Sequence, residues 1–549
     1  MPSVLITGAR VIDGTGNPWI HADVVLDGER IADIAPPRTI DRSSVDTVIE
    51  AEGMICCPGF IDIQSHSIVP FLTDRRSVSK VTQGVTTEIL GEGWTPAPFG
   101  GEIDAPFSIS LVHRLDENYD YWDTLGRTWT RFGQWLADIE ERGVSVNVGS
   151  FLGGGSVRKY GMGERMGEPN DQELDLMRKA TRESMEDGAF GVATALIYPP
   201  GAYAGTDELV EVMKVVAEHN GVHITHIRSE GDEIFEGLDE AIEIADRSGV
   251  ATEIYHLKAA GRDNWSKMAT VIERITAARN RGLDITADMY PYDGSGTGLA
   301  ACLPPWASAE GKRYQNLRDP EMRAKIIEEM RNPTGHWENL GARSGPGHVL
   351  LAEFSKPEHK MFQGRFLDDV AAELGLDWHE AIVHLLDREG GDIFTMYLMM
   401  SEDNLKQQFQ QEWIKISTDA GGIDPAIAAE KGLVHPRAYG TYTRVLGRYV
   451  REKGFMTWED AIRKSSSAVA DRLGLRDRGL LRAGMYADVV VFDPETVIDQ
   501  ATYTDPHHLS VGIRDVFVNG AAVLRDGEHT GELPGKRVNG PGYRPDAGA

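Results

Sequence analysis

The chain has 549 residues, of which 41% are hydrophobic and 26% are charged, an ordinary composition for a globular protein with a large core. Its formal net charge of -29 disfavours nucleic acids and anionic membrane surfaces as partners, because both are negatively charged. No apolar run reaches the roughly 18 residues of a membrane helix, and the start lacks the layout of a signal peptide, so we expect a cytoplasmic protein.

Both ends of the chain have the pattern of short β-strands. "SVLITGARVID" and "ADVVLDGERIADIAP" near the start, and "VGIRDVFVNGAAVLRDGEHTG" near the end, are rich in β-branched residues and interrupted by Gly and Asp turns. We therefore predict that residues 1–57 and 476–549 together form one small β-sandwich domain. Only the tail, residues 537–549, is expected to be disordered.

Between these ends, strand-like and helix-like segments alternate. Runs such as "VTTEILGE", "GVHITHIRSEG" and "LDITADMYPY" precede segments of helical periodicity, several of which end at Gly. This α/β order indicates a parallel sheet, and about eight such units in roughly 400 residues favour a closed (β/α)8 barrel, at residues 58–475, over an open sheet. The stretch from about 300 to 411 is too long for one crossover, so we expect a mostly helical insertion over the barrel mouth.

Polar side chains follow the predicted strands, at the end where barrel active sites are built. They are Gln64, His66, Glu92, His226, His256, Lys258 and Asp419. Imidazole and carboxylate suit zinc, and a catalytic zinc needs three protein ligands, a number that Glu92, His226 and His256 supply. Glu88 competes with Glu92 for this role, because it lies on the same face of the predicted strand.

Eight segments in order along the chain carry a family resemblance. They are "GVTTEILGEG", "LIYPPGAYAGTDEL", "THIRSEGD", "IYHLKAAG", "DMYPYDGSGTGL", "STDAGG", "HPRAYGTYTRVLGRYV" and "LRAGMYADVVVFDPETV". Together with "PGFIDIQSHS", this ordered set resembles the N-acyl-D-amino-acid deacylase (D-aminoacylase) group of the amidohydrolase superfamily. The resemblance implies a (β/α)8 barrel with a β-sandwich built from both termini, and zinc-dependent hydrolysis of an amide.

The resemblance also implies a role for single residues. His226 and His256 match the histidines of the tightly held zinc, and Asp419 matches a general acid/base, which takes a proton from the metal-activated water and returns it to the leaving nitrogen. The residues that match the grip on the substrate are Lys258, Tyr290 and Arg437 for its carboxylate and Tyr198 for the scissile carbonyl.

Three positions depart from the family pattern. The histidine pair after the first strand is reduced to Gln64 and His66, and a neutral amide is a poor ligand for zinc. We therefore expect one tightly bound zinc and a second site that is weak or empty, with His66 hydrogen bonding to water or to the substrate carbonyl. A bridging cysteine is replaced in "GEGW", where Glu92 is the side chain able to take over. A serine of the carboxylate clamp falls on Gly296, beside Ser295.

The predicted function is metal-dependent hydrolysis of N-acyl-D-amino acids or closely related N-acyl compounds. Two alternatives stay open: an amidohydrolase that acts on a cyclic amide, a small peptide or another acylated amine, and a catalytically silent member that binds a ligand. Gln64 could also orient the substrate carbonyl, since an amide both donates and accepts hydrogen bonds. The expected partner is a small N-acylated molecule, and a homo-oligomer is compatible with the sequence.

Overall fold

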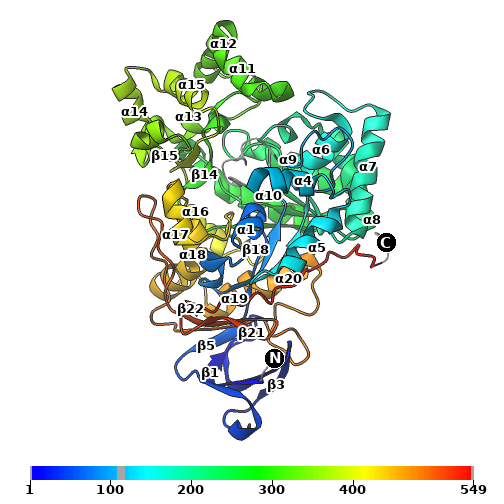
Figure 1. Ribbon diagram of the computed structural model, residues 1–549, viewed down its shortest axis with the longest axis vertical. Helices are drawn as coiled ribbons and strands as arrows, with labels where there is room; N and C mark the ends of the chain where they lie inside the picture. The colour runs from blue at the N-terminus through cyan, green and yellow to red at the C-terminus, as the bar shows by residue number, and fades with distance from the viewer. Residues whose placement is uncertain (1–2, 108–117, 546–549) are drawn as a thin grey trace.

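The computed structural model describes residues 3–107 and 118–545, and it has three structural parts along its long axis (Figure 1). Strands from both ends of the chain lie at the lower end, a body of parallel strands and helices lies in the middle, and a mainly helical segment lies at the upper end. The upper part has a hydrophobic cluster of its own, whereas the lower sheet divides its apolar side chains between a separate cluster and the core of the middle part.

The lower part is one nine-stranded sheet built from both ends of the chain. Its path is β22-β21-β20-β19-β5-β1-β2-β3, with β4 paired to β1. The strands are β1 (Val4–Val11), β2 (Ile20–Asp27), β3 (Arg30–Ala35), β4 (Thr47–Glu50), β5 (Ile55–Pro58), β19 (Val489–Phe492), β20 (Ile513–Val518), β21 (Ala521–Arg525) and β22 (Glu528–His529). The antiparallel pair β5–β19 joins the two ends, since Cys56 lies opposite Val491.

The middle part contains parallel strands in two sheets, β6-β7-β8 and β9-β10-β11-β12-β13-β18. They are β6 (Phe60–Asp62), β7 (Val85–Leu90), β8 (Asn147–Ser150), β9 (Leu152–Gly153), β10 (Gly191–Ala195), β11 (Val222–His226), β12 (Ala251–Ile254), β13 (Ile285–Met289) and β18 (Ile414–Ile416). Only Phe151 separates β8 from β9, and a parallel bridge between Ser65 and Ala420 links the segments that follow β6 and β18. The strand ends therefore surround one common space.

Helices alternate with these parallel strands along the chain. They are α1 (Ile68–Thr73), α2 (Val78–Val81), α4 (Tyr119–Gly126), α5 (Phe132–Arg142), α6 (Gly154–Met162), α7 (Asp171–Glu186), α8 (Thr206–Glu218), α9 (Ile234–Ser248), α10 (Met268–Asn280), α16 (Glu402–Phe409), α17 (Pro425–Lys431), α18 (Arg437–Arg444), α19 (Trp458–Ser465) and α20 (Ser467–Leu473). Local sequence sets their ends: Asn170 and Glu173 form a capping box before α7, and Gly249 ends α9 in the left-handed conformation.

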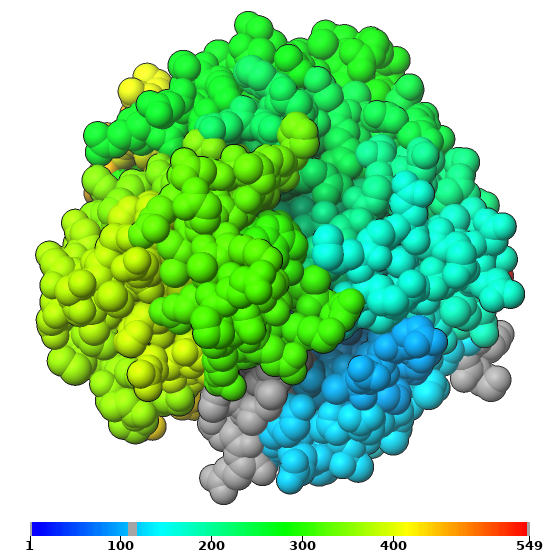
Figure 2. Space-filling view, turned by 90° about the horizontal axis from the view of Figure 1, so that it is seen from above, coloured from blue at the N-terminus to red at the C-terminus, as the bar shows by residue number. Residues whose placement is uncertain are grey.

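The upper part has its own sheet and its own core. Its elements are β14 (Ser295–Gly298), α11 (Arg313–Arg318), α12 (Pro320–Arg331), α13 (Leu340–Ser344), β15 (Val349–Glu353), β16 (Arg365–Phe366), α14 (Leu367–Leu374), α15 (Trp378–Glu389) and β17 (Phe394–Tyr397). The antiparallel sheet runs β14-β17-β15-β16. Seen from above, this green segment covers much of one end of the molecule (Figure 2). Helix α16 packs instead against α10, and Gln408 on α16 donates to the Leu257 carbonyl.

The prediction of a disordered tail is wrong for residues 537–545; residues 546–549 lie outside the described part. The Val538 amide donates to the Val148 carbonyl at 2.8 Å, and the Val538 side chain is 5% exposed. Val538 packs with the apolar side chains of Phe190 and Ile224. Glycine and proline made this segment look unstructured, but its backbone runs beside β8 and finds hydrogen-bond partners there.

Two further features are the cysteines and the absence of a membrane-crossing helix from the described residues. Cys56, Cys57 and Cys302 are free thiols and all three are buried, which agrees with a packing role. Across residues 3–107 and 118–545, none of the helices combines the length and the apolar character that a membrane crossing requires.

Candidate functional site

A cavity of about 800 Å³ opens at the carboxyl ends of the parallel strands, under the upper part of the molecule. Because these strands run in the same direction, the residues at their ends meet around one rim. The predicted site residues that line the cavity are His66, Glu92, Tyr198, His226, His256, Lys258, Tyr290, Asp419 and Arg437. Gln64 belongs to the same cluster through its hydrogen bonds.

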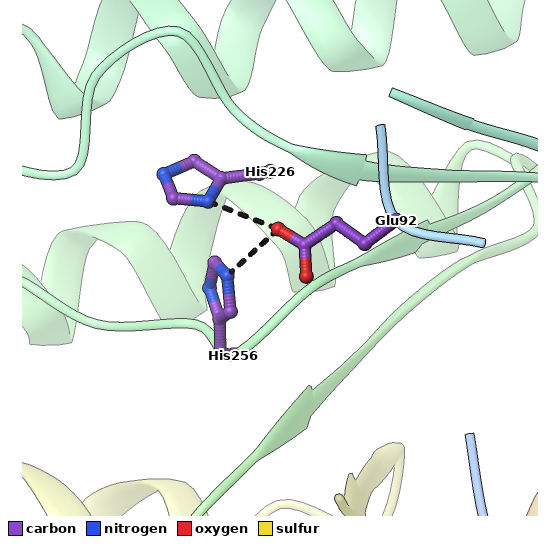
Figure 3. A group of neighbouring side chains, drawn as sticks. All are labelled: Glu92, His226 and His256. Carbon is purple, nitrogen blue, oxygen red and sulfur yellow. Dashed lines mark hydrogen bonds and ion pairs between the residues drawn. The ribbon is translucent and has the colours of Figure 1, made fainter. Parts of the chain in front are cut away.

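Glu92, His226 and His256 lie together, as the sequence predicts. Figure 3 shows both imidazoles facing the same oxygen of Glu92. That oxygen, Oε1, lies 3.4 Å from His226 Nδ1 and 3.6 Å from His256 Nε2. Two ligands that each bind zinc at 2.0–2.1 Å with tetrahedral angles lie about 3.3 Å apart, whereas hydrogen bonds are shorter. The spacing therefore fits three ligands around one divalent ion.

Glu230, which sequence reasoning missed, orients these histidines from behind. Its carboxylate lies 3.0 Å from His256 Nδ1 and 3.6 Å from His226 Nε2, and it accepts a hydrogen bond of 2.6 Å from Lys258. Lys258 Nζ lies 2.7 Å from the same His256 Nδ1, so a donor and a carboxylate both contact this nitrogen, while Nε2 faces Glu92. Burial and Lys258 lower the pKa of His256, but Glu230 and Asp419 raise it to about 10, so binding a cation must displace a proton.

The second oxygen of Glu92, Oε2, contacts a different set of side chains from Oε1. Glu92 Oε2 accepts a hydrogen bond of 2.6 Å from the Gln64 amide nitrogen and lies 3.4 Å from His66 Nε2. The same two nitrogens also contact Asp419 Oδ1, at 3.2 Å for Gln64 and 2.8 Å for His66. His66, Glu92 and Asp419 thus form a second cluster with potential ligand atoms.

Asp419 is held from three directions. Its backbone has φ of 51°, a left-handed conformation that is strained for a non-glycine residue, and its amide donates to the Gln64 carbonyl at 2.9 Å. Its Oδ2 pairs with Arg437 at 2.6 Å. Burial raises the pKa of Asp419, but Arg437, His256 and His66 outweigh burial and lower it below the usual value. Asp419 is therefore ionised at neutral pH and able to accept a proton.

The predicted grip on the substrate carboxylate includes Arg437, which contacts Asp419 Oδ2, whereas Gln64 and His66 contact Oδ1. The Arg437 guanidinium lies 4.7 Å from the centre of the Tyr290 ring, donates to the Gly296 carbonyl at 3.1 Å, and is 4% exposed. Lys258 Nζ lies 5.6 Å from the same ring. Arg437 Nε has no hydrogen-bond partner among the described residues. A buried guanidinium with an unused N–H is suited to a carboxylate ligand.

Tyr198 and Gly296 connect the site to β14. Tyr198 lines the cavity together with Thr297 of β14, and the Tyr198 ring packs edge-on against His226 at 5.3 Å. A Cβ atom at Gly296 would lie 2.8 Å from Phe394 Cζ, so β17 already fills the space of a side chain at this position. A serine at this position would therefore require Phe394 to shift.

Glu88, the alternative to Glu92, lies elsewhere. Its carboxylate accepts hydrogen bonds from the hydroxyls of Ser65, Ser67 and Ser77, and it lies 3.7 Å from buried Lys80. These partners satisfy its oxygens away from the two histidines. The structure therefore brings Glu92, and not Glu88, to the candidate metal ligands.

Two other buried carboxylates were also missed from the sequence. Asp288 on β13 accepts from the His256 amide at 2.9 Å and from Ser417 at 2.6 Å. Asp62 on β6 pairs with Lys80 and accepts from the Thr418 amide at 2.9 Å, next to Asp419. Both lie on strands of apolar pattern, and a polar residue on such a strand is the signal that could have identified them.

Known proteins resemble this chain over almost its entire length. The chain is 32% identical to N-acyl-D-glutamate deacylase of Alcaligenes xylosoxydans xylosoxydans over 95% of this chain and 93% of the relative. It is 31% identical to D-aminoacylase of the same organism over 97% of this chain and 96% of the relative. This chain belongs to the D-aminoacylase group of the amidohydrolase superfamily. A family model described as "Amidohydrolase family" also matches residues 419–524 of this amidohydrolase.

Solved structures agree with this membership. N-acyl-D-glutamate deacylase of Bordetella bronchiseptica, solved with zinc and a phosphonate mimic of the tetrahedral intermediate, is 30% identical, with a TM-score of 0.79 over 98% of this chain and 99% of that one. A D-aminoacylase structure is 29% identical with a TM-score of 0.80 over the same shares. The predicted family and the predicted fold class of this amidohydrolase are therefore confirmed.

Proposed function

We propose that this protein is a metal-dependent hydrolase that cleaves the amide bond of N-acyl-D-amino acids and releases a carboxylic acid and a free D-amino acid. The observation that carries the proposal is the meeting of Glu92, His226 and His256 with Asp419 in one cavity that Lys258 and Arg437 also line. Relatives that match almost the whole chain bear the names of deacylases for this substrate class, and the D configuration comes from them.

Glu92, His226 and His256 would hold one divalent ion, with zinc as the best match for two imidazoles and a carboxylate. Zinc at this place supplies a Lewis acid for the amide carbonyl and acidifies water. The three side chains are at most 8% exposed, so the cavity wall shields the centre from bulk solvent. We propose that the second cluster, at His66, is weak or empty.

The chain's own residues would divide the remaining work. Asp419, ionised and fixed by Arg437, removes a proton from water and returns it to the leaving nitrogen, because an amine departs poorly as an anion. Tyr198, which lines the cavity and packs against His226, faces the scissile carbonyl. Arg437 and Lys258 hold the substrate carboxylate beside Tyr290. His66 donates a hydrogen bond to water or to the carbonyl.

A second candidate substrate is an acylated amine without a free carboxylate. Gly296 provides no side chain for the clamp, and both cations already have acidic partners: Lys258 contacts Glu230 and Arg437 contacts Asp419. Cyclic amides and small peptides belong to this candidate. An N-acyl amino acid would therefore bind with its carboxylate and Asp419 both contacting Arg437. A substrate without a carboxylate would leave Arg437 to Asp419 alone.

A matched substrate panel separates the candidates. Zinc-loaded protein is incubated with N-acetyl and longer N-acyl amino acids in both D and L forms, and with the carboxamide of each, and amine release is measured. We expect turnover of the D acids and loss of turnover for the carboxamides. Equal turnover of acids and carboxamides would support the second candidate. Zinc bound without turnover of the panel would contradict the first candidate and direct the search to cyclic amides and small peptides, and a silent ligand-binding member would follow only if these also stay intact.

A further inference from the structure

Gln64 occupies the place between two carboxylates that face each other across the site. Its side-chain nitrogen donates to Glu92 Oε2 at 2.6 Å and to Asp419 Oδ1 at 3.2 Å, and the residue is 1% exposed. Its backbone carbonyl accepts from the Asp419 amide at 2.9 Å. One residue therefore fixes both the side chain and the backbone of Asp419.

The orientation of this amide is determined by chemistry. Both neighbours are acceptor-only when ionised, so only the NH2 end of Gln64, with its two donors, is compatible with them. A flipped amide would place its oxygen against two carboxylate oxygens and lose both hydrogen bonds. On the other side, Ser417 Oγ lies 3.5 Å from Gln64 Oε1, which is compatible with the same orientation.

A second cation would need this same place. The oxygens of Glu92 and Asp419 that contact Gln64 are the ones that lie 3.4 Å and 2.8 Å from His66 Nε2. These three side chains form the second potential ligand cluster. An ion that joins them must displace the Gln64 N–H groups from both carboxylates, and the amide offers no good ligand in return.

We propose that Gln64 is a built-in substitute for a second metal ion: its amide bridges Glu92 and Asp419 and keeps further divalent ions away from Asp419. This inference rests on the proposed metal centre at Glu92, His226 and His256. It deepens the proposed function, because it makes the protein a one-metal hydrolase that excess metal does not slow. The related D-aminoacylase has a binuclear centre with second-metal attenuation.

The test is a zinc-binding titration of chelator-treated protein, with the bound metal counted by elemental analysis after dialysis. Wild-type protein is expected to bind one zinc per chain, and Gln64→His is expected to bind two, because an imidazole replaces the amide. Gln64→Leu removes the amide without adding a ligand, which frees the oxygens of Glu92 and Asp419, so a second zinc is expected to bind, more weakly than in Gln64→His. A single zinc in Gln64→Leu would show that the amide itself excludes nothing and would overturn the inference. Circular dichroism of each variant checks its fold.

Activity gives an independent readout. Excess zinc is expected to leave wild-type turnover unchanged and to lower the turnover of Gln64→His. Two zinc ions bound to wild-type protein would overturn the inference while leaving the proposed hydrolase intact. One zinc on wild-type protein that turns over no member of the panel would support the inference and overturn the proposed function. Absence of zinc binding would overturn both.

Discussion

At the level of single residues, Glu92 shows how the two oxygens of one carboxylate can serve different partners. Oε1 faces the two histidines (Figure 3). Oε2 contacts Gln64 and His66. Removing Glu92 would therefore disturb both clusters at once. Asp419 contacts Gln64 and His66, and Glu230 contacts the two histidines. A substitution of Asp419 therefore tests proton transfer, and a substitution of Glu230 tests metal binding.

We predict that Asp419→Asn lowers kcat by about 100- to 10,000-fold, because the amide cannot take a proton from water. Zinc content should stay at the wild-type level, since the three proposed ligands are untouched. Steady-state kinetics and metal analysis measure the two effects. Asp424→Asn is the matched control: Asp424 lines the same cavity and caps α17, a role that asparagine keeps. Comparable loss in both variants would refute the role of Asp419.

We predict that Glu230→Gln weakens zinc binding by about 10- to 100-fold, because a neutral amide removes the negative charge that faces the outer nitrogens of both His256 and His226. Competition with a chelator at constant pH measures the affinity. Glu240→Gln serves as control, since Glu240 pairs with Arg228 away from the histidines. Unchanged zinc affinity in Glu230→Gln would show that Glu230 has no orienting role.

The residues that could be predicted are those with a chemical signature at a strand end. His226, His256 and Asp419 follow strand-like runs, and parallel strands bring their ends together. Glu230 carries no such signature, because a glutamate in a loop after a strand looks like an exposed side chain. The structure shows that Glu230 is buried and paired with Lys258, which the sequence does not indicate.

At the level of elements, β14 illustrates what sequence pattern cannot show. The pairing of β14 with β17 joins Ser295 to Tyr397, about 100 residues apart, and this pairing places Phe394 against Gly296. Sequence indicated an insertion at about the right place, but the contact between its sheet and the barrel depends on long-range pairing. A serine at position 296 would conflict with that contact.

We predict that Gly296→Ser destabilises the protein by about 1–3 kcal/mol, because its Cβ would overlap the Phe394 ring and force a shift. Urea unfolding measures the change. Gly391→Ser is the control within the same insertion, because a Cβ there meets no described atom within 4 Å. The double variant Gly296→Ser with Phe394→Leu should recover part of the loss. A neutral effect of Gly296→Ser would contradict the packing argument.

At the level of the whole molecule, the two chain ends share a sheet that flanks the parallel strands, and the insertion covers their carboxyl ends (Figures 1 and 2). The sequence predicted strands at both ends of the chain. It also predicted alternating strands and helices between them. The packing of residues 537–545 was not visible in the sequence, because this segment is stabilised by contacts with the middle part of the molecule and not by its own local sequence.

Buried polar groups inside this body couple its stability to pH. His223 on β11 is fully buried, and burial lowers its pKa to about 3 from the ordinary 6.5. Its Nε2 lies 3.0 Å from the Thr194 hydroxyl, while Nδ1 has no partner among the described residues. In the unfolded chain His223 takes up a proton below pH 6.5, but the folded protein resists this down to about pH 3.

The stability contributed by a neutral His223 is therefore lost as pH falls from 6.5 toward 3, because the unfolded state binds the extra proton. Between pH 7 and pH 5 we predict a loss of about 2 kcal/mol from this residue. Urea unfolding of wild-type protein, His223→Gln and, as control, exposed His348→Gln at both pH values measures it. The loss should shrink by that amount in His223→Gln alone, since glutamine does not titrate, and an equal loss in all three proteins would show that other groups dominate acid unfolding.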